Sequence, residues 1–223
     1  MTAKITPEFL EGIKDLNFKV LQVAIDDNEG FMAKVHIFGE DQDYVVMTPF
    51  SDDEEKVSML SKVGKLAYEK GASQLIFVSD TYLKTYSNEK DLNTAMENWE
   101  TERPSLYPDS MRTSAILMYI LDFKDAGNEK ILVYRYKVVD KKVVQLEPMN
   151  DLDSEAGDSL IKRVLSESFF KALLGDFLKK KEVLTEDILN SSKGEKIVSD
   201  FIESVEKDYP NLLIKKSDKT DSK

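Results

Sequence analysis

The sequence Ala115-Ile116-Leu117-Met118-Tyr119-Ile120-Leu121 is apolar at every position, and so is the shorter run Leu75-Ile76-Phe77-Val78. A strand with one solvated face alternates apolar and polar residues, whereas a strand buried on both faces is apolar throughout. We therefore predict that both runs are central strands of a sheet with helices covering its faces.

Further β-rich runs flank these two, at residues 18–26, 31–38, 44–48, 130–139 and 143–146. Turn-forming clusters such as Asp26-Asp27-Asn28-Glu29-Gly30 separate neighbouring runs, which is typical of antiparallel hairpins. The sequence thus predicts an α+β fold with a mainly antiparallel sheet of about six to seven strands.

Helical spacing of apolar residues appears in five places, one of which is a short helix indicated by Leu92, Ala95, Met96 and Trp99. A short helix opens at Thr6-Pro7, a second over 53–70 follows a capping box at Ser51-Asp52-Asp53-Glu54, and two more are expected over 157–182 and 194–208. The 53–70 helix is predicted to cover one face of the sheet. The two C-terminal helices either cover the other face or form a small helical subdomain.

The composition changes near residue 148, and everything after it reads as helical. We therefore divide the chain into an α+β sheet domain over 1–148 with an insert at 80–112, a helical C-terminal region over 149–214, and a disordered tail over 215–223.

The chain has no cysteine and one histidine, His36. This excludes disulfides, thiolate nucleophiles and zinc sites built from Cys and His, and we expect no cofactor and no bound metal. His36 shares a strand face with Lys34, which favours a surface or half-buried histidine over a general base.

Charge and hydropathy restrict the partners. With 31 basic and 42 acidic residues the net charge is −11, which opposes binding to nucleic acid or to an anionic membrane. No apolar run approaches the roughly eighteen residues of a membrane span, and residues 1–10 lack the apolar core of a signal peptide. We expect a cytoplasmic protein.

The connection 80–112 between the two apolar runs is unusually long and contains the only tryptophan, Trp99. It also holds two of the four arginines, Arg103 and Arg112, and the aromatic Tyr107. These residue types dominate binding hot spots, so we predict that these four side chains form a binding surface. In the alternative interpretation, the arginines pair with nearby acids such as Glu100 and only fasten the loop.

A family resemblance begins in the same segment. Phe77-Val78-Ser79-Asp80-Thr81-Tyr82, then Pro104-Ser105-Leu106-Tyr107-Pro108-Asp109, then an apolar strand, resembles a group of uncharacterised bacterial and phage proteins. Those proteins have a strand ending Val-Ser-Glu-x-Trp, a Pro-Ser-x-x-Pro-Asp-Arg loop and a strand. Here Asp80, Tyr82 and Ser110 replace the glutamate, tryptophan and arginine. The resemblance covers residues 75–147, supports the strand–insert–strand order and implies no reaction.

Two catalytic interpretations use the carboxylates. Pro108-Asp109 with Asp122-Phe123-Lys124 matches the PD-(D/E)xK string of nucleases, but one strand over 113–123 would separate these acids by roughly 40 Å, too far to share a metal. The second interpretation is a carboxylate-dependent, Mg²⁺-assisted hydrolase or phosphotransfer enzyme that uses Asp80, Glu102 and Asp109.

The favoured expectation is a non-enzymatic protein-binding or assembly module, phage-related by the resemblance above. Its partner is another protein, whose identity the sequence does not give. The sequence does not determine the oligomeric state either.

Overall fold

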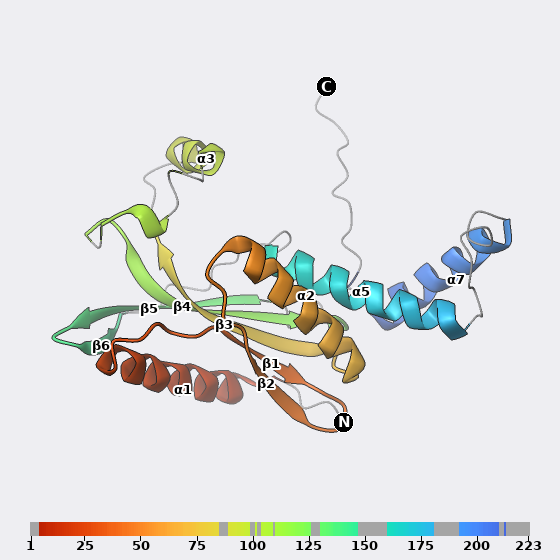
Figure 1. The fold of residues 1–223 in the computed structure, drawn as a ribbon, viewed down its shortest axis with the longest axis horizontal. Coiled ribbons are helices and arrows are strands. Elements are labelled where there is room, and N and C mark those ends of the chain that lie inside the picture. The colour runs from red at the N-terminus through yellow and green to blue at the C-terminus, as the bar shows by residue number, and fades with distance from the viewer. Residues whose placement is uncertain are drawn as a thin grey trace.

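The computed structural model describes residues 5–84, 89–98, 101, 104–108, 110–125, 130–146, 160–180, 192–209 and 212. Within these ranges, six strands form one antiparallel sheet in the order β2-β1-β3-β4-β5-β6 (Figure 1). The strands are β1 (Lys34–Phe38), β2 (Asp43–Met47), β3 (Gln74–Leu83), β4 (Thr113–Asp122), β5 (Lys130–Val139) and β6 (Lys142–Gln145). The predicted α+β class with a mainly antiparallel sheet is confirmed.

The two apolar runs occupy the middle of the sheet, as predicted. β3 pairs with β4 along its whole length, from Gln74 opposite Asp122 to Leu83 opposite Thr113. Leu75 and Phe77 belong to the hydrophobic cluster on one face of the sheet, while Ile76 and Val78 belong to the cluster on the other. Burial on both faces explains why these runs contain no polar residue.

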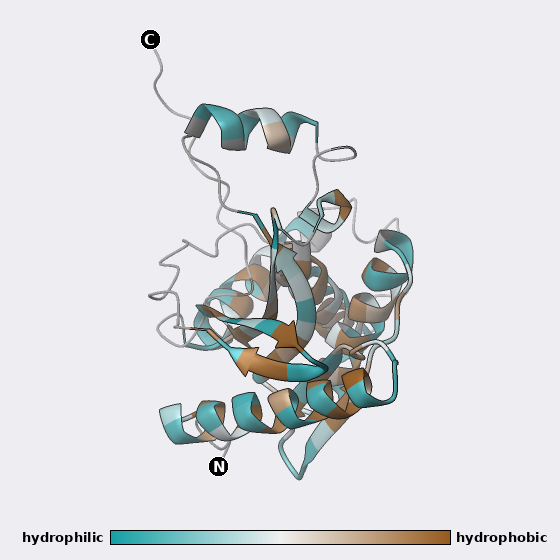
Figure 2. Ribbon diagram, turned by 90° about the vertical axis from the view of Figure 1, so that its left-hand side faces the viewer, coloured by the Kyte–Doolittle hydropathy of each residue, from teal (hydrophilic) through white to brown (hydrophobic). Residues whose placement is uncertain are grey.

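Helices cover both faces of the sheet. α1 (Pro7–Asp26) lies under one face, and α2 (Asp53–Glu69), α5 (Leu160–Lys180) and α7 (Ser192–Asp208) lie on the opposite side (Figure 1). In Figure 2, brown segments are visible on several strands, and α1 alternates brown with teal along its length, as expected for a helix with one face on the sheet. In the described part of the chain, no helix is long and apolar enough to cross a membrane.

The predicted strand over 18–26 is wrong, because α1 continues to Asp26. Its buried side chains include Leu10, Ile13, Phe18 and Leu21, a helical spacing that spans the predicted boundary. The β-branched residues of 18–26 favour a strand locally, but burial of this face against the sheet outweighs that preference.

Of the two arrangements expected for the C-terminal helices, packing on the face opposite α2 is excluded. α5 and α7 join α2 in one hydrophobic cluster, through residues such as Leu60 of α2, Leu165 of α5 and Phe201 of α7. The full-length α1 already covers the opposite face, so this outcome and the wrong strand over 18–26 share one cause. The predicted boundary at 148/149 and the tail 215–223 lie outside the described residues.

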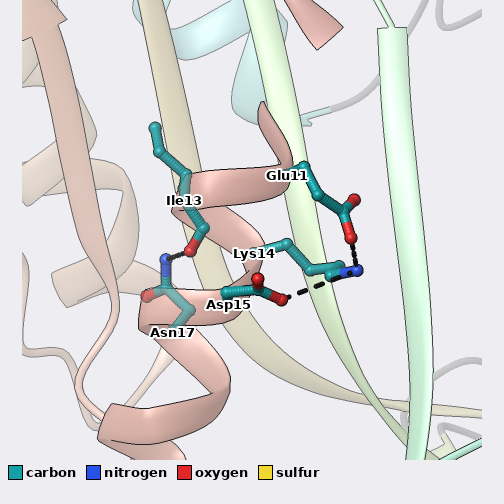
Figure 3. A network of polar contacts seen from close by, with 5 residues as sticks. All are labelled: Glu11, Ile13, Lys14, Asp15 and Asn17. Atoms are coloured by element: carbon teal, nitrogen blue, oxygen red, sulfur yellow. Dashed lines mark hydrogen bonds and ion pairs between the residues drawn. The ribbon is translucent and has the colours of Figure 1, made fainter. Parts of the chain in front are cut away.

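Polar contacts accompany the packing of α1 (Figure 3). Lys14 pairs with Glu11 and, at 3.7 Å, with Asp15, and its Nζ lies 5.7 Å from the centre of the Tyr134 ring on β5. The buried Asn17 donates a 2.7 Å hydrogen bond to the Ile13 carbonyl. The hydrogen bond satisfies the Asn17 amide nitrogen, whereas its Oδ1 is buried without a hydrogen-bond partner among the described residues.

The insert is shorter than the predicted 80–112, because residues 80–83 continue β3 and pair with β4. α3 (Glu89–Glu97) is the short helix that the spacing of Leu92 and Ala95 predicts, and it lies beyond the ends of β3 and β4 (Figure 1). A 3₁₀ turn, η1 (Pro104–Leu106), precedes β4.

A close helix contact leads to a first prediction. A Cβ added at Gly64 of α2 would lie 2.6 Å from the Leu165 carbonyl oxygen of α5 and 2.9 Å from the Ser168 Cβ. We expect Gly64→Ala to lower the free energy of unfolding by about 1–3 kcal/mol in urea titrations, although alanine favours helix by about 1 kcal/mol.

Gly175 of α5 provides the matched control. A Cβ added there would meet no atom within 4 Å. Gly175→Ala should therefore raise the free energy of unfolding by about 1 kcal/mol, the difference in helix propensity. If both substitutions shifted stability in the same direction, the close α2–α5 contact would not be the deciding feature.

Candidate functional site

An open cavity of about 530 Å³ lies where α1 ends beside β3, β4 and β5. We call it the Asp80 pocket. Its wall combines one half-buried carboxyl group with aromatic, aliphatic and basic side chains. Among the residues that line it are Leu21, Ile25, Glu29, Phe31, Asp80, Tyr82, Arg112, Ser114, Tyr136 and Lys137.

Strand register places the polar wall of this pocket. Tyr82 of β3 is paired with Ser114 of β4, which is paired with Tyr136 of β5, so these three residues form one row across the sheet. Asp80 belongs to the adjacent row and points to the same face, since side chains alternate along a strand. The Tyr136 hydroxyl reaches diagonally across this face and donates a 2.8 Å hydrogen bond to Asp80 Oδ1.

Burial changes the acidity of both partners in this hydrogen bond. It raises the pKa of Asp80, while the hydrogen bonds from Tyr136 and from the Thr81 backbone N–H act in the opposite direction. The pKa of Tyr136 is raised by burial and by the negative charge of Asp80. Tyr136 therefore stays a hydroxyl donor, and Asp80 is a carboxyl group held in poor contact with water.

Arg112 lies at the mouth of the pocket and links β3 to η1. Its guanidinium carbon is 3.8 Å from the centre of the Tyr82 ring, which is a cation–π stacking distance. Its Nη1 donates a 2.6 Å hydrogen bond to the Ser105 carbonyl oxygen. This arginine therefore fixes the 3₁₀ turn against the end of the sheet.

A second cation–π contact fixes the same turn. Lys84 Nζ lies 3.3 Å from the centre of the Tyr107 ring. Around these contacts three large apolar side chains are exposed to solvent: Tyr82 by 37 %, Leu106 by 54 % and Met111 by 54 %. We call the surface formed by Tyr82, Lys84, Leu106, Tyr107, Met111 and Arg112 the β3–β4 rim.

The structure brings several of the predicted site residues together. Arg112 and Asp80, which the sequence assigns to different hypotheses, line one pocket, and Tyr107 lies in the adjoining rim. The other predicted residues lie outside the described residues: Trp99, Glu100, Glu102, Arg103 and Asp109.

Sequence reasoning missed Tyr136 and Ser114. The alternation of β5 does place Leu132, Tyr134 and Tyr136 on one face, and all three belong to the α1-side cluster. What the sequence lacks is the register between β3, β4 and β5, because hairpin and insert lengths do not specify it. Without that register, nothing connects Tyr136 with Asp80.

The remaining polar candidates lie elsewhere. His36 is half-buried on β1, and the acid of the rejected nuclease string, Asp122, is buried and accepts a hydrogen bond from Gln74. Among the described residues, no three side chains of the His, Asp or Glu type gather closely enough to hold a metal ion. The carboxylate set of the enzyme hypothesis, apart from Asp80, falls outside those residues.

The structure is consistent with the strand–insert–strand order that the sequence resemblance over residues 75–147 supports. The resemblance itself stays a prediction. No protein-family model, no curated protein and no solved structure matches this chain.

Proposed function

We propose that this protein is a non-enzymatic binding module that contacts another protein through the β3–β4 rim. The observation that carries the proposal is the exposure of Tyr82, Leu106 and Met111 around Arg112, at the mouth of a pocket. Aromatic and arginine side chains with apolar neighbours contribute most of the energy in protein interfaces. Contiguous exposed apolar groups are a mark of such interfaces.

The rim is fixed before a partner arrives. Arg112 holds the Ser105 carbonyl and stacks on Tyr82, and Lys84 stacks on Tyr107. η1 itself starts at Pro104, whose ring limits the backbone. A surface that is ordered in the free protein loses less conformational entropy on binding, which favours affinity.

The charge of the molecule indicates the kind of partner. A net charge of −11 repels acidic proteins and attracts basic ones over a Debye length of about 8–10 Å. We therefore propose a partner with a net basic charge, although the two charged residues of the rim itself, Lys84 and Arg112, are basic and lie against the rings of Tyr107 and Tyr82.

Affinity capture tests the proposal. The immobilised wild-type protein is compared with the double variant Leu106→Ser/Met111→Ser. The variant should capture about one tenth or less of the amount of partner that the wild type captures. The matched control is Leu16→Ser/Val23→Ser, which alters two residues of α1 with similar exposure, 52 % and 59 %. If the rim variant retained every protein that the wild type captures, the rim would not be the contact surface.

The carboxylate-dependent, Mg²⁺-assisted hydrolase or phosphotransferase is the second candidate. One observation favours it: the pKa of Asp80 is raised at a cavity wall, as is common for a general acid or base. A calorimetric titration with MgCl₂ separates the two candidates. Saturable Mg²⁺ binding that disappears in Asp80→Asn would favour the enzyme, because the proposed binding module needs no metal.

A further inference from the structure

We propose that the Asp80 pocket receives a basic side chain, a lysine ammonium or an arginine guanidinium, presented by a peptide segment of the partner protein. This inference rests on the proposed binding function and names the chemistry that the pocket recognises.

The carboxyl group of Asp80 lines the cavity. Its hydrogen bonds come from the Tyr136 hydroxyl and from the Thr81 backbone N–H, both uncharged donors. Within the described ranges, no lysine or arginine lies at ion-pair distance from it. Burial disfavours its ionised form, and a cation bound in the cavity would restore that form.

The walls of the pocket suit a cation with an aliphatic stem. Phe31, Tyr82 and Tyr136 line it together with Asp80. Two of these rings already hold a cation of the protein, since Lys34 Nζ lies 4.9 Å from the centre of the Phe31 ring and the Arg112 guanidinium carbon lies 3.8 Å from that of Tyr82. Aromatic faces at this pocket therefore attract ammonium and guanidinium groups. Leu21 and Ile25 of α1 add apolar surface. Lysine and arginine match both features, because their methylene chains pack on apolar side chains while the charged end reaches a carboxylate.

An exposed donor at the pocket indicates a peptide rather than a free cation. The Arg112 guanidinium is directed to Ser105 and Tyr82, whereas Lys137 is exposed to solvent. Lys137 is a hydrogen-bond donor, and the backbone carbonyls of a peptide are acceptors. A basic side chain inserted toward Asp80 would bring such carbonyls near Lys137, which lines the same pocket. A cavity of about 530 Å³ is of the usual size for a ligand site.

The test uses four short peptides, each acetylated and amidated, with glycines around one central lysine, arginine, glutamine or glutamate. Binding is followed by NMR on the ring signals of Tyr82 and Tyr136, which are assigned from the Tyr82→Phe and Tyr136→Phe variants. The lysine or the arginine peptide should shift both rings in a saturable manner, and the glutamine and glutamate peptides should not.

Two variants with the same change in net charge identify the site. Asp80→Asn keeps the shape of the side chain and should lower the affinity for the basic peptide at least about tenfold. Glu69→Gln removes an exposed acid of α2 that pairs with Lys65, and it should leave binding unchanged. Tyr136→Phe, which removes the hydroxyl donor to Asp80, should alter the affinity as well.

The outcomes separate this inference from the proposed function. If no basic peptide shifts the two rings, or if the glutamine peptide shifts them equally, the basic-side-chain site is refuted, while rim-dependent capture of a partner can still hold. If Asp80→Asn and Glu69→Gln weaken binding by the same factor, the attraction is due to overall charge, and the inference is wrong.

Discussion

Replacing Phe169 with alanine is expected to lower the free energy of unfolding by about 3–5 kcal/mol, the usual loss for a fully buried phenylalanine. Phe169 of α5 is only 1 % exposed. The centre of its ring lies 4.3 Å from the ring centre of Phe123, which directly follows β4. The same ring centre lies 5.4 Å from the ring centres of Tyr68 on α2 and Tyr209 after α7. One side chain therefore joins the end of the sheet to three helices, and its removal leaves a cavity that they cannot fill together.

Urea unfolding followed by circular dichroism measures this loss. Phe9→Ala is the matched control, because Phe9 is 42 % exposed and makes one ring contact, with Phe38 at 5.4 Å. Phe9→Ala should lower the free energy of unfolding clearly less than Phe169→Ala does. The expected curve of the Phe169 variant is a single transition at lower urea. A first transition that melts helix alone, with the sheet unchanged, would show that α5 is energetically separate from the sheet.

Acidification from neutral pH to pH 4 is expected to lower the free energy of unfolding by about 3 kcal/mol through His36 alone. Each pH unit between the two pKa values of this histidine contributes about 1.4 kcal/mol. Burial on β1, reinforced by the charge of Lys34 on the same strand face, lowers the pKa of His36 from 6.5 to about 4. Its Nε2 has no hydrogen-bond partner within the described residues. Between these two pKa values the unfolded chain binds a proton that the folded chain does not bind, so stability falls as the pH falls.

The variant His36→Gln isolates this contribution. Above pH 6.5 the imidazole of the wild type is neutral in the folded and the unfolded protein, so His36 makes no pH-dependent contribution to stability there. In that range the variant and the wild type differ only through the change in packing at position 36. Between pH 6.5 and 4 the stability of the variant should fall less than that of the wild type. The raised pKa of Asp80 acts in the opposite direction in this range, but it is common to both proteins and cancels in the difference.

Because the chain has a single histidine, its imidazole gives one unambiguous NMR titration. A midpoint near 6.5 in the folded protein, or equal pH dependence of the two stabilities, would contradict the buried neutral histidine.

Much of the fold could be predicted because its signals are local. The fully apolar runs at 75–78 and 115–121 indicate central strands wherever they occur in a chain, since burial on both faces requires apolar residues at every position. The helical spacing of Leu60, Val63 and Ala67 likewise identifies the buried face of α2. The prediction for residues 18–26 failed because their β-branched composition and their helical spacing give opposite signals, and packing against the sheet decided between them.

The candidate site could be predicted only in part. Unusual residue types, Arg112 among them, mark the insert as a candidate binding surface, and the carboxyl group of Asp80 is a candidate reactive group on composition and position alone. Their common pocket depends on Ser114 and Tyr136, which lie one strand and two strands after Asp80 along the chain. Pairing between distant strands sets that neighbourhood, and a shift by one residue would turn Tyr136 to the opposite face.

The order of most helices and strands, the central position of β3 and β4 and the acidic character of the molecule follow from the sequence by itself, because hydrophobicity and charge belong to each segment wherever it lies. Tertiary structure alone decided that α1 covers the face opposite α2 and α5. It also decided that Gly64 lies against the backbone of a neighbouring helix, while the space beside Gly175 is open. Finally, it decided that Asp80 accepts a hydrogen bond from the Tyr136 hydroxyl. These three features are contacts between segments far apart in the chain, and such contacts exist only once the register and the packing are fixed.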